Sequence, residues 1–288
     1  MSDTEPGAPA ANADQVAYWN TSAGETWAAL QENLDRQLEP LGRLAMDALG
    51  PRPGEHVVDI GCGCGQTTLE LAARVAPDGL VFGVDVSAPM LAVASERAGR
   101  RAPSLVRILQ ADAQTHRFER GRSDCGFSRF GVMFFADPAA AFSNIRSALR
   151  PGGRLGFVCW RAMALNPFMT APLEAAIALL PCAPAPAAPE APGPFAFADS
   201  DRVRAILARA GFGGVNITPH DEAIGGGTVD QAVNTALRIG PLGAILRERP
   251  ELSVAVEEAV REVMTRHLTD RGVFLPSASW IVTAHNPA

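Results

Sequence analysis

The sequence predicts an α/β fold in which a doubly wound, mostly parallel sheet carries helices on both faces. Short apolar runs of strand length alternate with amphipathic helix patterns from residue 56 onward, and such alternation favours a parallel sheet. A glycine-rich loop joins the first strand of this series to its first helix, as in nucleotide-binding folds. The chain has 288 residues and is 47% hydrophobic, which is enough for a sizeable core.

The elements are expected in a regular order along the chain. Residues 15–49 contain two helix patterns, in which Trp27, Leu30 and Leu34 share one apolar face and Gly50 ends the second helix. Ser87 is the expected N-cap of one later helix, and Ser200 of another. The expected strands cover residues 56–60, 80–85, 105–110, 124–130, 154–160, 214–218 and 277–284, and the expected helices cover residues 66–75, 89–100, 138–149 and 201–210, with an amphipathic helix marked by Leu252, Val256, Ala259 and Val263.

Composition shifts divide the chain into segments. Residues 1–14 are small, acidic and rich in Pro and Ala, and we expect a disordered tail. The other expected segments are N-terminal helices at 15–50, a nucleotide-binding core at 51–160, a lid or linker insertion at 161–198, and a C-terminal part of the core at 199–288 with a helical insertion at about 224–272. The two insertions should cover the strand ends and determine which substrate is bound.

Charge and cysteine content exclude several classes of protein. The net charge is −6 and the pI is about 5.4, which disfavours a nucleic-acid partner. Arg97, Arg100 and Arg101 form a small basic run, which we interpret as a solvated helix end. No basic, apolar leader and no apolar run near ~20 residues is present, so we expect no membrane span and a cytoplasmic location. Five cysteines form no disulfide framework, and Cys62 and Cys64 lack further ligands, so no metal site is predicted.

The glycine loop itself indicates which cofactor it holds. Gly61, Gly63 and Gly65 alternate, and Gln66 occupies the place of the third glycine of the dinucleotide fingerprint. Asp59 lies two residues before the first glycine, where its carboxylate would repel a pyrophosphate. S-adenosylmethionine has no phosphate and carries a sulfonium and an ammonium, so the sign of the charge favours this cofactor over NAD.

Asp59-x-Gly-x-Gly-x-Gly resembles motif I of the class I S-adenosylmethionine-dependent methyltransferases. Further matches follow in order: Asp85 resembles the ribose-binding acid, residues 110–113 the segment that meets adenine, and residues 149–155 the turn into the fifth strand. The resemblance covers about residues 45–160. Residues 18–27 and 128–135 are similar to the small-molecule branch that includes the ubiquinone and menaquinone biosynthesis methyltransferases. The family implies a Rossmann-like, seven-stranded sheet whose last strand is antiparallel beside strand five.

The resemblance also implies the roles of individual residues. Asp85 should hold the ribose hydroxyls, Asp112 should meet the adenine amino group, and Asp59 should orient the methionine ammonium or fix the loop. A structural cap or turn is the alternative for each of these acids. The other residues expected at the cofactor are Trp19, Trp27, Gly61, Cys62, Gly63, Gly65, Val86, Met90, Ala111, Ala113, Ser128 and Arg129.

The substrate pocket has a weaker signature in the sequence. His220 follows the sixth strand and is the best candidate for a general base, although lone histidines are usually structural. Aromatic and neighbouring residues near the expected mouth could line the pocket or belong to the core. The candidates are Tyr18, Phe134, Trp160, Asn166 and Phe168.

The predicted function is SN2 transfer of a methyl group to a small-molecule acceptor, hydrophobic or aromatic, with S-adenosylhomocysteine as the product. Positioning can supply much of the rate enhancement, so no general base is required. One alternative is a protein that binds S-adenosylmethionine without transferring its methyl group. A second alternative, which Asp59 and the glycine spacing oppose, is an NAD-dependent oxidoreductase. The N-terminal helices or residues 224–272 could support a homodimer.

Overall fold

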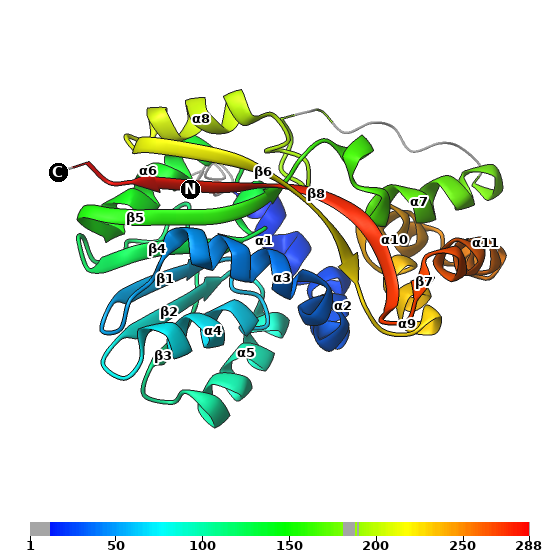
Figure 1. Cartoon of the computed structure of the whole chain (residues 1–288), viewed down its shortest axis with the longest axis horizontal. Coiled ribbons are helices and arrows are strands. Elements are labelled where there is room, and N and C mark those ends of the chain that lie inside the picture. The colour runs from blue at the N-terminus through cyan, green and yellow to red at the C-terminus, as the bar shows by residue number, and fades with distance from the viewer. Residues whose placement is uncertain (1–11, 181–187, 189, 288) are drawn as a thin grey trace, which may run out of the picture.

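A computed structural model describes residues 12–180, 188 and 190–287 of the chain. Seven strands form one continuous sheet in the order β3-β2-β1-β4-β5-β8-β6, and the short β7 pairs with β8. The strands are β1 (His56–Ile60), β2 (Leu80–Asp85), β3 (Val106–Gln110), β4 (Ser123–Arg129), β5 (Leu149–Trp160), β6 (Gly213–Gly225), β7 (Leu268–Thr269) and β8 (Gly272–His285). Figure 1 shows this sheet running across the molecule.

The first five strands of the sheet, β1 to β5, are parallel to one another, whereas β8 is antiparallel to both of its neighbours. β8 lies directly beside β5, with Trp160 opposite Ser279. This arrangement confirms the predicted seven-stranded, mostly parallel sheet with its last strand antiparallel beside strand five. The central β1 is apolar at Val57, Val58 and Ile60, all buried, because a parallel strand is covered on both faces.

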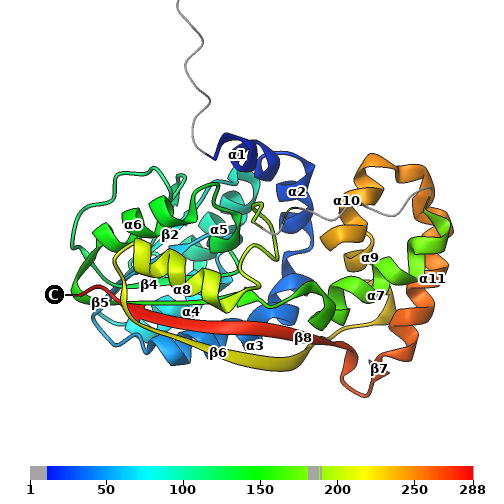
Figure 2. The same cartoon turned by 90° about the horizontal axis from the view of Figure 1, so that it is seen from above.

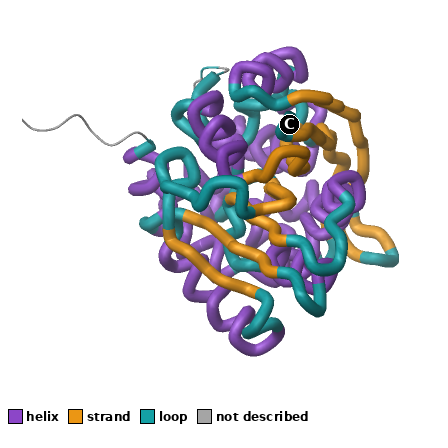
Figure 3. The backbone as a smooth tube through the Cα atoms, turned by 90° about the vertical axis from the view of Figure 1, so that its left-hand side faces the viewer, coloured by secondary structure: helices purple, strands orange, loops and turns teal. Residues whose placement is uncertain are grey.

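Helices cover both faces of the sheet (Figures 1 and 3). From β1 the chain adds strands toward one edge of the sheet, in the order β1, β2, β3, and from β4 it adds strands toward the other edge. Because crossover connections are right-handed, the helices of these two halves lie on opposite faces of the sheet. One face carries α3 (Gln31–Leu49), α4 (Gln66–Val75) and α5 (Ala88–Arg101), and the other carries α6 (Pro138–Ala148) and α8 (Ser200–Arg209).

Two further helices precede α3, and the second of them packs against α5 while the first packs against the second. They are α1 (Ala13–Trp19) and α2 (Ser22–Ala29). Two helix patterns were predicted in this region, and the structure has three helices because the chain turns at Asn20 and again at Leu30. α1 begins at Ala13, so the predicted tail to residue 14 extends too far, and residues 1–11 lie outside the described part of the chain.

A second group of helices packs beyond the carboxyl end of β5 (Figure 2). We call α7 (Pro167–Ala176), α9 (Val229–Ala236), α10 (Gly240–Glu248) and α11 (Ser253–Arg266) the outer helices. They share their own hydrophobic cluster, to which α11 contributes Val256, Val260 and Met264. The long β6–β8 pair extends from the main sheet to this group, and Val273 and Leu275 of β8 join its core.

From β1 onward, most strand and helix limits agree with the expected limits to within a residue or two, and the larger differences concern β5, β6 and β8. β5 begins at Leu149 instead of residue 154. β6 runs to Gly225 instead of residue 218, and β8 begins at Gly272 instead of residue 277, because the two strands pair along their whole length. Asp199 is the N-cap of α8, since its carboxylate accepts from the Asp201 N–H, so the expectation of a Ser200 cap is wrong. Of the Pro/Ala-rich connection, residues 181–187 and 189 lie outside the described ranges. In the described residues, no helix has the length and apolar character to cross a membrane.

Candidate functional site

The glycine loop lies between β1 and α4 and is held tightly by its own backbone. Gly61, Gly63 and Gly65 all have positive φ angles. A side chain on Gly61 would meet the Gly131 Cα at 2.7 Å, so the loop and the end of β4 can approach this closely only through two glycines. The Gly61 N–H donates to the Val84 carbonyl at 2.8 Å, which fixes the loop against the end of β2.

Asp85 ends β2 beside this loop and is 8% exposed. One carboxylate oxygen accepts from the Gly63 N–H at 2.8 Å, and the other accepts from the Ser87 N–H at 2.9 Å. Burial raises the pKa of Asp85, against the opposing effect of these backbone hydrogen bonds. Each oxygen keeps a second acceptor position, so the carboxylate can still receive hydroxyl groups from a ligand.

Asp59 lies one strand away, beneath the start of α4, and is fully buried. Its Oδ2 accepts from the hydroxyl groups of Thr67 and Thr68, each at 2.7 Å. Its Oδ1 is buried without a hydrogen-bond partner. Burial raises the pKa of Asp59 to about 6, although the two hydroxyl groups oppose the shift. An unpaired, buried carboxylate oxygen beside the loop suits a cationic ligand better than an anionic one.

Asp112 follows β3 on the same edge of the sheet. Its Oδ1 accepts from the Gln114 N–H at 2.9 Å and from the Asn12 amide at 3.3 Å. Asn12 also accepts from the Ala136 N–H at 3.2 Å, so the start of α1 bridges the ends of β3 and β4. Asp112 can therefore stabilise the turn through Oδ1 and still bind a ligand through Oδ2, because Oδ2 has only a long 3.4 Å contact to Thr115.

The N-terminal helices close over the β2–α5 connection. The Ser87 hydroxyl donates to the Trp19 carbonyl at 2.7 Å, so Ser87 holds the N-cap position of α5 without a side-chain cap bond. Asn20 donates to the Val86 carbonyl at 2.9 Å and accepts from the Ala88 N–H at 2.9 Å. Asp85 and Met90, on either side of this connection, are 8% and 5% exposed.

Four aromatic side chains gather where the N-terminal helices meet the end of β4. Trp19 lies edge-to-face with Tyr18, Trp27 and Phe134, at centroid distances of 5.2, 5.8 and 5.3 Å. Two of these residues were expected at the cofactor and two at the substrate, and the structure brings all four into one cluster. Such edge-to-face contacts stabilise a cluster beyond the burial of its area.

A charged network behind the loop was not predicted from the sequence. Asp35 of α3 forms ion pairs with Arg97 at 2.9 Å and with Arg129 at 3.8 Å. Arg97 also donates to the Cys64 carbonyl at 2.7 Å, and Arg129 donates to Gln66. We had expected Arg97 to be a solvated residue at a helix end, but these contacts show that it is not. Burial lowers the pKa of Arg129, an effect that nearby Asp35 opposes. Long-range ion pairs of this kind leave no local pattern that sequence analysis could detect.

The side chains of several residues predicted to contact the cofactor or the substrate interact with other parts of the protein. The fully buried Ser128 hydroxyl donates to the Ile60 carbonyl at 2.7 Å and ties β4 to β1. The Cys62 side chain packs with Leu91 and Ala94. The Asn166 amide donates to two backbone carbonyls and accepts from the Ala278 N–H at 2.9 Å, so its polar atoms are engaged within the protein.

The remaining backbone positions keep the places that the sequence suggested. The Ala111 N–H donates to the Asp85 carbonyl at 2.9 Å, and Ala113 is buried beside it. The Val86 carbonyl accepts from Asn20 and from Gln110, so Val86 is fixed through its backbone. Ala111 and Val86 thus lie at the ends of β3 and β2, around the space between Asp85 and Asp112.

His220 does not lie near the loop. It belongs to the edge strand β6, and the sheet order places β4, β5 and β8 between β6 and β1. Its ring interacts with Glu222 at 3.2 Å and faces a surface depression beside Glu39 and Arg43 of α3. The predicted general base is therefore not supported, because sequence position alone does not reveal which face an edge-strand residue presents.

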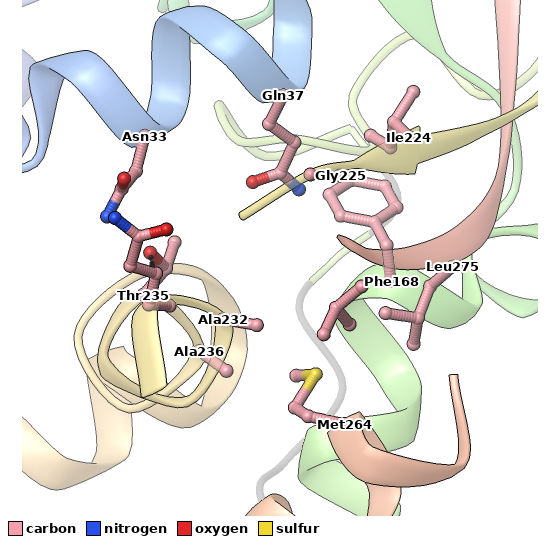
Figure 4. Close-up of a pocket in the computed structure, with 13 residues that line it drawn as sticks. Asn33, Gln37, Phe168, Ile224, Gly225, Ala232, Thr235, Ala236, Met264 and Leu275 are labelled. Atoms are coloured by element: carbon pink, nitrogen blue, oxygen red, sulfur yellow. Dashed lines mark hydrogen bonds between the residues drawn. The ribbon is translucent and has the colours of Figure 1, made fainter. Parts of the chain in front are cut away.

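Trp160 and Phe168 form a second aromatic group with Phe130. Phe130 stacks on Trp160 at a centroid distance of 3.9 Å, and Trp160 lies 4.7 Å from Phe168. Trp160 is only 5% exposed and belongs to the core, whereas Phe168 lines a cavity between α3 and the outer helices (Figure 4). Of these two predicted substrate residues, Phe168 alone reaches a cavity.

The described cysteines are free thiols. Cys62, Cys125 and Cys159 are buried and Cys64 is half-buried. Burial raises the pKa of Cys64 and Cys125 to about 12, so these thiols stay protonated near neutral pH. Within the described ranges, no group of three or more His, Cys, Asp and Glu residues could hold a metal ion. Cys182 lies outside these ranges.

Comparison with known proteins supports the interpretation of the fold and the loop. Residues 57–153 match a methyltransferase domain family. Nocamycin O-methyltransferase from Saccharothrix syringae is 31% identical over 145 residues, which are 48% of this chain and 52% of that protein. Demethylmenaquinone methyltransferase from Symbiobacterium thermophilum is 38% identical over 112 residues, 38% of this chain and 44% of that protein. The matches thus span about half the length of these curated relatives.

Two solved structures share the fold. Geranyl diphosphate C-methyltransferase from Streptomyces coelicolor A3(2), in complex with Mg²⁺, geranyl diphosphate and S-adenosyl-L-homocysteine, has a TM-score of 0.53 at 19% identity. The alignment covers 98% of this chain and 100% of that one. The cyclase SpnF has a TM-score of 0.55 at 20% identity over 87% of this chain and 82% of its own. At these identities the likeness concerns the fold.

The sheet order, the glycine loop with its acids and the family match define the class of protein. The part of the chain that they identify is a class I S-adenosylmethionine-dependent methyltransferase domain. Residues 57–153, from β1 into β5, form its methyltransferase domain.

Proposed function

We propose that this protein transfers a methyl group from S-adenosylmethionine to a hydrophobic or aromatic small molecule. The observation that carries the proposal is the pair of buried acids at the glycine loop. Asp59 presents an unpaired oxygen, and Asp85 holds the Gly63 N–H while keeping free acceptor positions. The pair suits a cofactor with cationic groups and ribose hydroxyls, and it opposes a pyrophosphate.

The proposed binding mode follows the edge of the sheet. Asp85 would accept the ribose hydroxyls, and Asp112 would meet the adenine amino group between Ala111 and Ala113. The methionine part would lie at Gly61–Gly65, with its ammonium toward Asp59. Trp19 and Trp27 would close over the cofactor from the N-terminal helices. Arg129 lies on the same face of the sheet as Asp59, and the two charges attract each other, so Arg129 is suited to the methionine carboxylate.

S-adenosylmethionine, when bound, supplies a methyl group already activated by its sulfonium. The chain then has to orient the acceptor in line with that methyl group and exclude water. The N-terminal helices and the aromatic cluster around Trp19 are placed to exclude water, because they cover the ends of β2, β3 and β4. Effective molarities of ~10⁵–10⁸ M are available from such positioning, so no catalytic histidine is needed.

The acceptor is proposed to be hydrophobic because aromatic side chains surround the expected position of the methyl group. Tyr18 and Phe134 contact Trp19 on one side, and Phe130 and Trp160 stack on the other. The names of relatives, among them the nocamycin and demethylmenaquinone methyltransferases, agree with a small-molecule acceptor.

Incubation with methyl-labelled S-adenosylmethionine tests the reaction. The purified protein is mixed with a small-molecule extract, and the label that moves into the organic phase is measured. We expect labelled products with the wild type and a loss of at least tenfold with Asp85→Asn. Arg100→Gln, at an exposed surface pair, is the matched control and should keep full activity. Absence of any labelled product across chemically diverse extracts would refute methyl transfer.

Binding without methylation is the second candidate function. The structural neighbour SpnF is named a cyclase, so this fold also serves other reactions. Tight binding of S-adenosylhomocysteine without any label transfer would favour this candidate. A dehydrogenase would instead bind NAD, which Asp59 and Gln66 oppose.

We also propose a cytoplasmic location, which the free, buried cysteines support, since disulfides are rare in that compartment. The proposed acceptor is a small molecule and no nucleic acid is involved. A homodimer is tested by light scattering coupled to size-exclusion chromatography, where a mass near twice 30.3 kDa would show it.

A further inference from the structure

A small cavity lies between the main fold and the outer helices (Figure 4). It measures about 60 Å³ and is bounded by α3, α7, α9, α11 and the far ends of β6 and β8. Its lining includes Gln37, Phe168, Ile224, Ala236 and Met264. This volume is less than half of the roughly 150 Å³ of an apolar cavity that binds benzene, so the cavity can take a ring substituent but not a whole ring.

The lining carries no charged side chain, and one of its polar groups is free. The Gln231 amide accepts from the Thr228 N–H at 3.0 Å, and the Thr235 hydroxyl donates to the Gln231 carbonyl at 2.8 Å. Asn33 accepts from Arg36 at 3.4 Å. The amide of Gln37 forms no hydrogen bond within the described residues, and Figure 4 shows it extending from α3 toward Gly225 and Phe168. Its NH₂ group and its carbonyl oxygen are thus both offered to a ligand.

The aromatic residues connect the cavity to the glycine loop. Phe168 lies in the cavity wall and packs on Trp160, which stacks on Phe130. Gly131 follows Phe130 in the chain and packs directly against Gly61 of the loop. Phe130 and Trp160 are buried and form the packed wall between the cavity and the loop, so an acceptor that passes this wall from the loop would reach the cavity at Phe168 and Gln37.

We propose that this cavity is a subsite for the distal end of the acceptor, and that it selects an uncharged, oxygen-bearing group such as a hydroxyl or carbonyl. The proposal rests on the proposed function and deepens it. Gln37 would donate to or accept from that oxygen, while Phe168, Ile224 and Met264 contact the hydrocarbon around it. An ammonium is disfavoured because no acid lines the cavity, and an anion could pair only with Arg36, an exposed residue that reaches the rim at Asn33 and Gly227.

Three naphthalenes of one shape and different charge test the subsite. 2-Naphthol, 2-naphthoate and 2-naphthylmethylamine are titrated calorimetrically into the full chain, with and without saturating S-adenosylhomocysteine. We expect 2-naphthol to bind at least tenfold more tightly than either charged probe. Gln37→Leu should weaken 2-naphthol binding about tenfold, as expected for one lost hydrogen bond to a buried group. Ala236→Leu, which fills the cavity, should abolish it.

Gln37→Glu provides the complementary change, because a carboxylate in the cavity should recruit the cationic probe. Asn216→Leu removes an exposed amide at the other end of β6 and should leave all three affinities unchanged. Equal binding of the charged probes to the wild type, absence of 2-naphthol binding, or wild-type affinity in both Gln37→Leu and Ala236→Leu would overturn the subsite. Circular dichroism and the S-adenosylhomocysteine titration check that each variant is folded. Failure of that titration in the wild type would refute the proposed function, whereas the naphthol measurement without cofactor reports on the subsite separately.

Discussion

Arg247 of α10 donates a hydrogen bond to the hydroxyl of Tyr18, at 2.9 Å, across 229 positions of the chain. Its guanidinium also lies 5.9 Å from the centre of the Tyr18 ring. This contact joins the N-terminal helices, which pack on the β2–α5 connection, to the outer helices, which border the cavity beside α3. If the proposed cofactor binds at the nearly inaccessible Asp85, we expect its exchange to require this contact to open.

Tyr18→Phe should therefore speed cofactor exchange. The change removes the hydrogen bond and keeps the ring, and a half-exposed hydrogen bond contributes about 0.5–1.5 kcal/mol. We expect S-adenosylhomocysteine to dissociate about two- to tenfold faster, measured by stopped-flow tryptophan fluorescence. Arg249→Lys, which changes an exposed arginine of a pair with Glu251, should not alter the rate. An unchanged dissociation rate in Tyr18→Phe would show that the contact does not control opening.

Gly131→Ala tests the close approach of the loop to β4. A methyl group on Gly131 would lie 2.8 Å from both the Gly61 Cα and the Ile60 carbonyl oxygen, and neither backbone atom can move away freely. We expect a loss of about 1–3 kcal/mol in the free energy of unfolding, with weaker cofactor binding. Gly99→Ala, in α5 with no atom within 4 Å of the added methyl, should instead stabilise the protein by about 0.5–1 kcal/mol. Urea denaturation of both variants measures the difference, and a fully stable Gly131→Ala would contradict it.

Much of the core was predictable because its signals are local. β1, α4 and β2 have the predicted limits, since a buried strand, a glycine loop and an amphipathic helix each have their own pattern. The tertiary pairings were not predictable. Asp35 meets Arg97 and Arg129 only in the folded chain, and the burial of Asn166 against Ala278 depends on how α7 packs. Pro219 interrupts the strand pattern in β6, which is tolerated because β6 is an edge strand.

Asp35→Asn should loosen the glycine loop from α3. The Asp35 side chain is only 14% exposed, and without its charge Arg97 and Arg129 would remain close together without an acid between them. We expect a loss of about 1–3 kcal/mol in stability and a weaker affinity for S-adenosylhomocysteine, because Arg97 no longer holds the Cys64 carbonyl in place. Glu96→Gln breaks an exposed pair with Arg100 and should change stability by less than about 0.5 kcal/mol. Equal effects of the two changes would argue against the network.

Asp59 should make the folded protein less stable as the pH rises, which is the opposite of the usual effect of an acidic residue. Its pKa is about 6 in the folded chain, above the ordinary value of 3.8, because burial penalises the charged form. The folded state therefore binds the proton more tightly than the unfolded state, and this contribution is present at low pH and lost as pH rises through about 6. The loss approaches about 3 kcal/mol.

The comparison with Asp59→Asn isolates this effect. The wild type should lose stability relative to the variant between pH 4 and 7, as measured by urea unfolding at each pH. A cationic cofactor should restore part of the loss, since it stabilises the ionised carboxylate. Parallel pH profiles for the two proteins would show that Asp59 keeps an ordinary pKa.

The central claim is that the acids at the glycine loop bind S-adenosylmethionine, and calorimetric titration with S-adenosylhomocysteine tests it most directly. We expect micromolar binding to the wild type and at least a tenfold loss, about 1.4 kcal/mol, in Asp85→Ala. Asp85→Asn, which can still accept from one backbone N–H, distinguishes loss of the ribose contact from collapse of the loop around Gly63. Absence of S-adenosylhomocysteine binding, together with binding of NAD or NADP, would contradict the account.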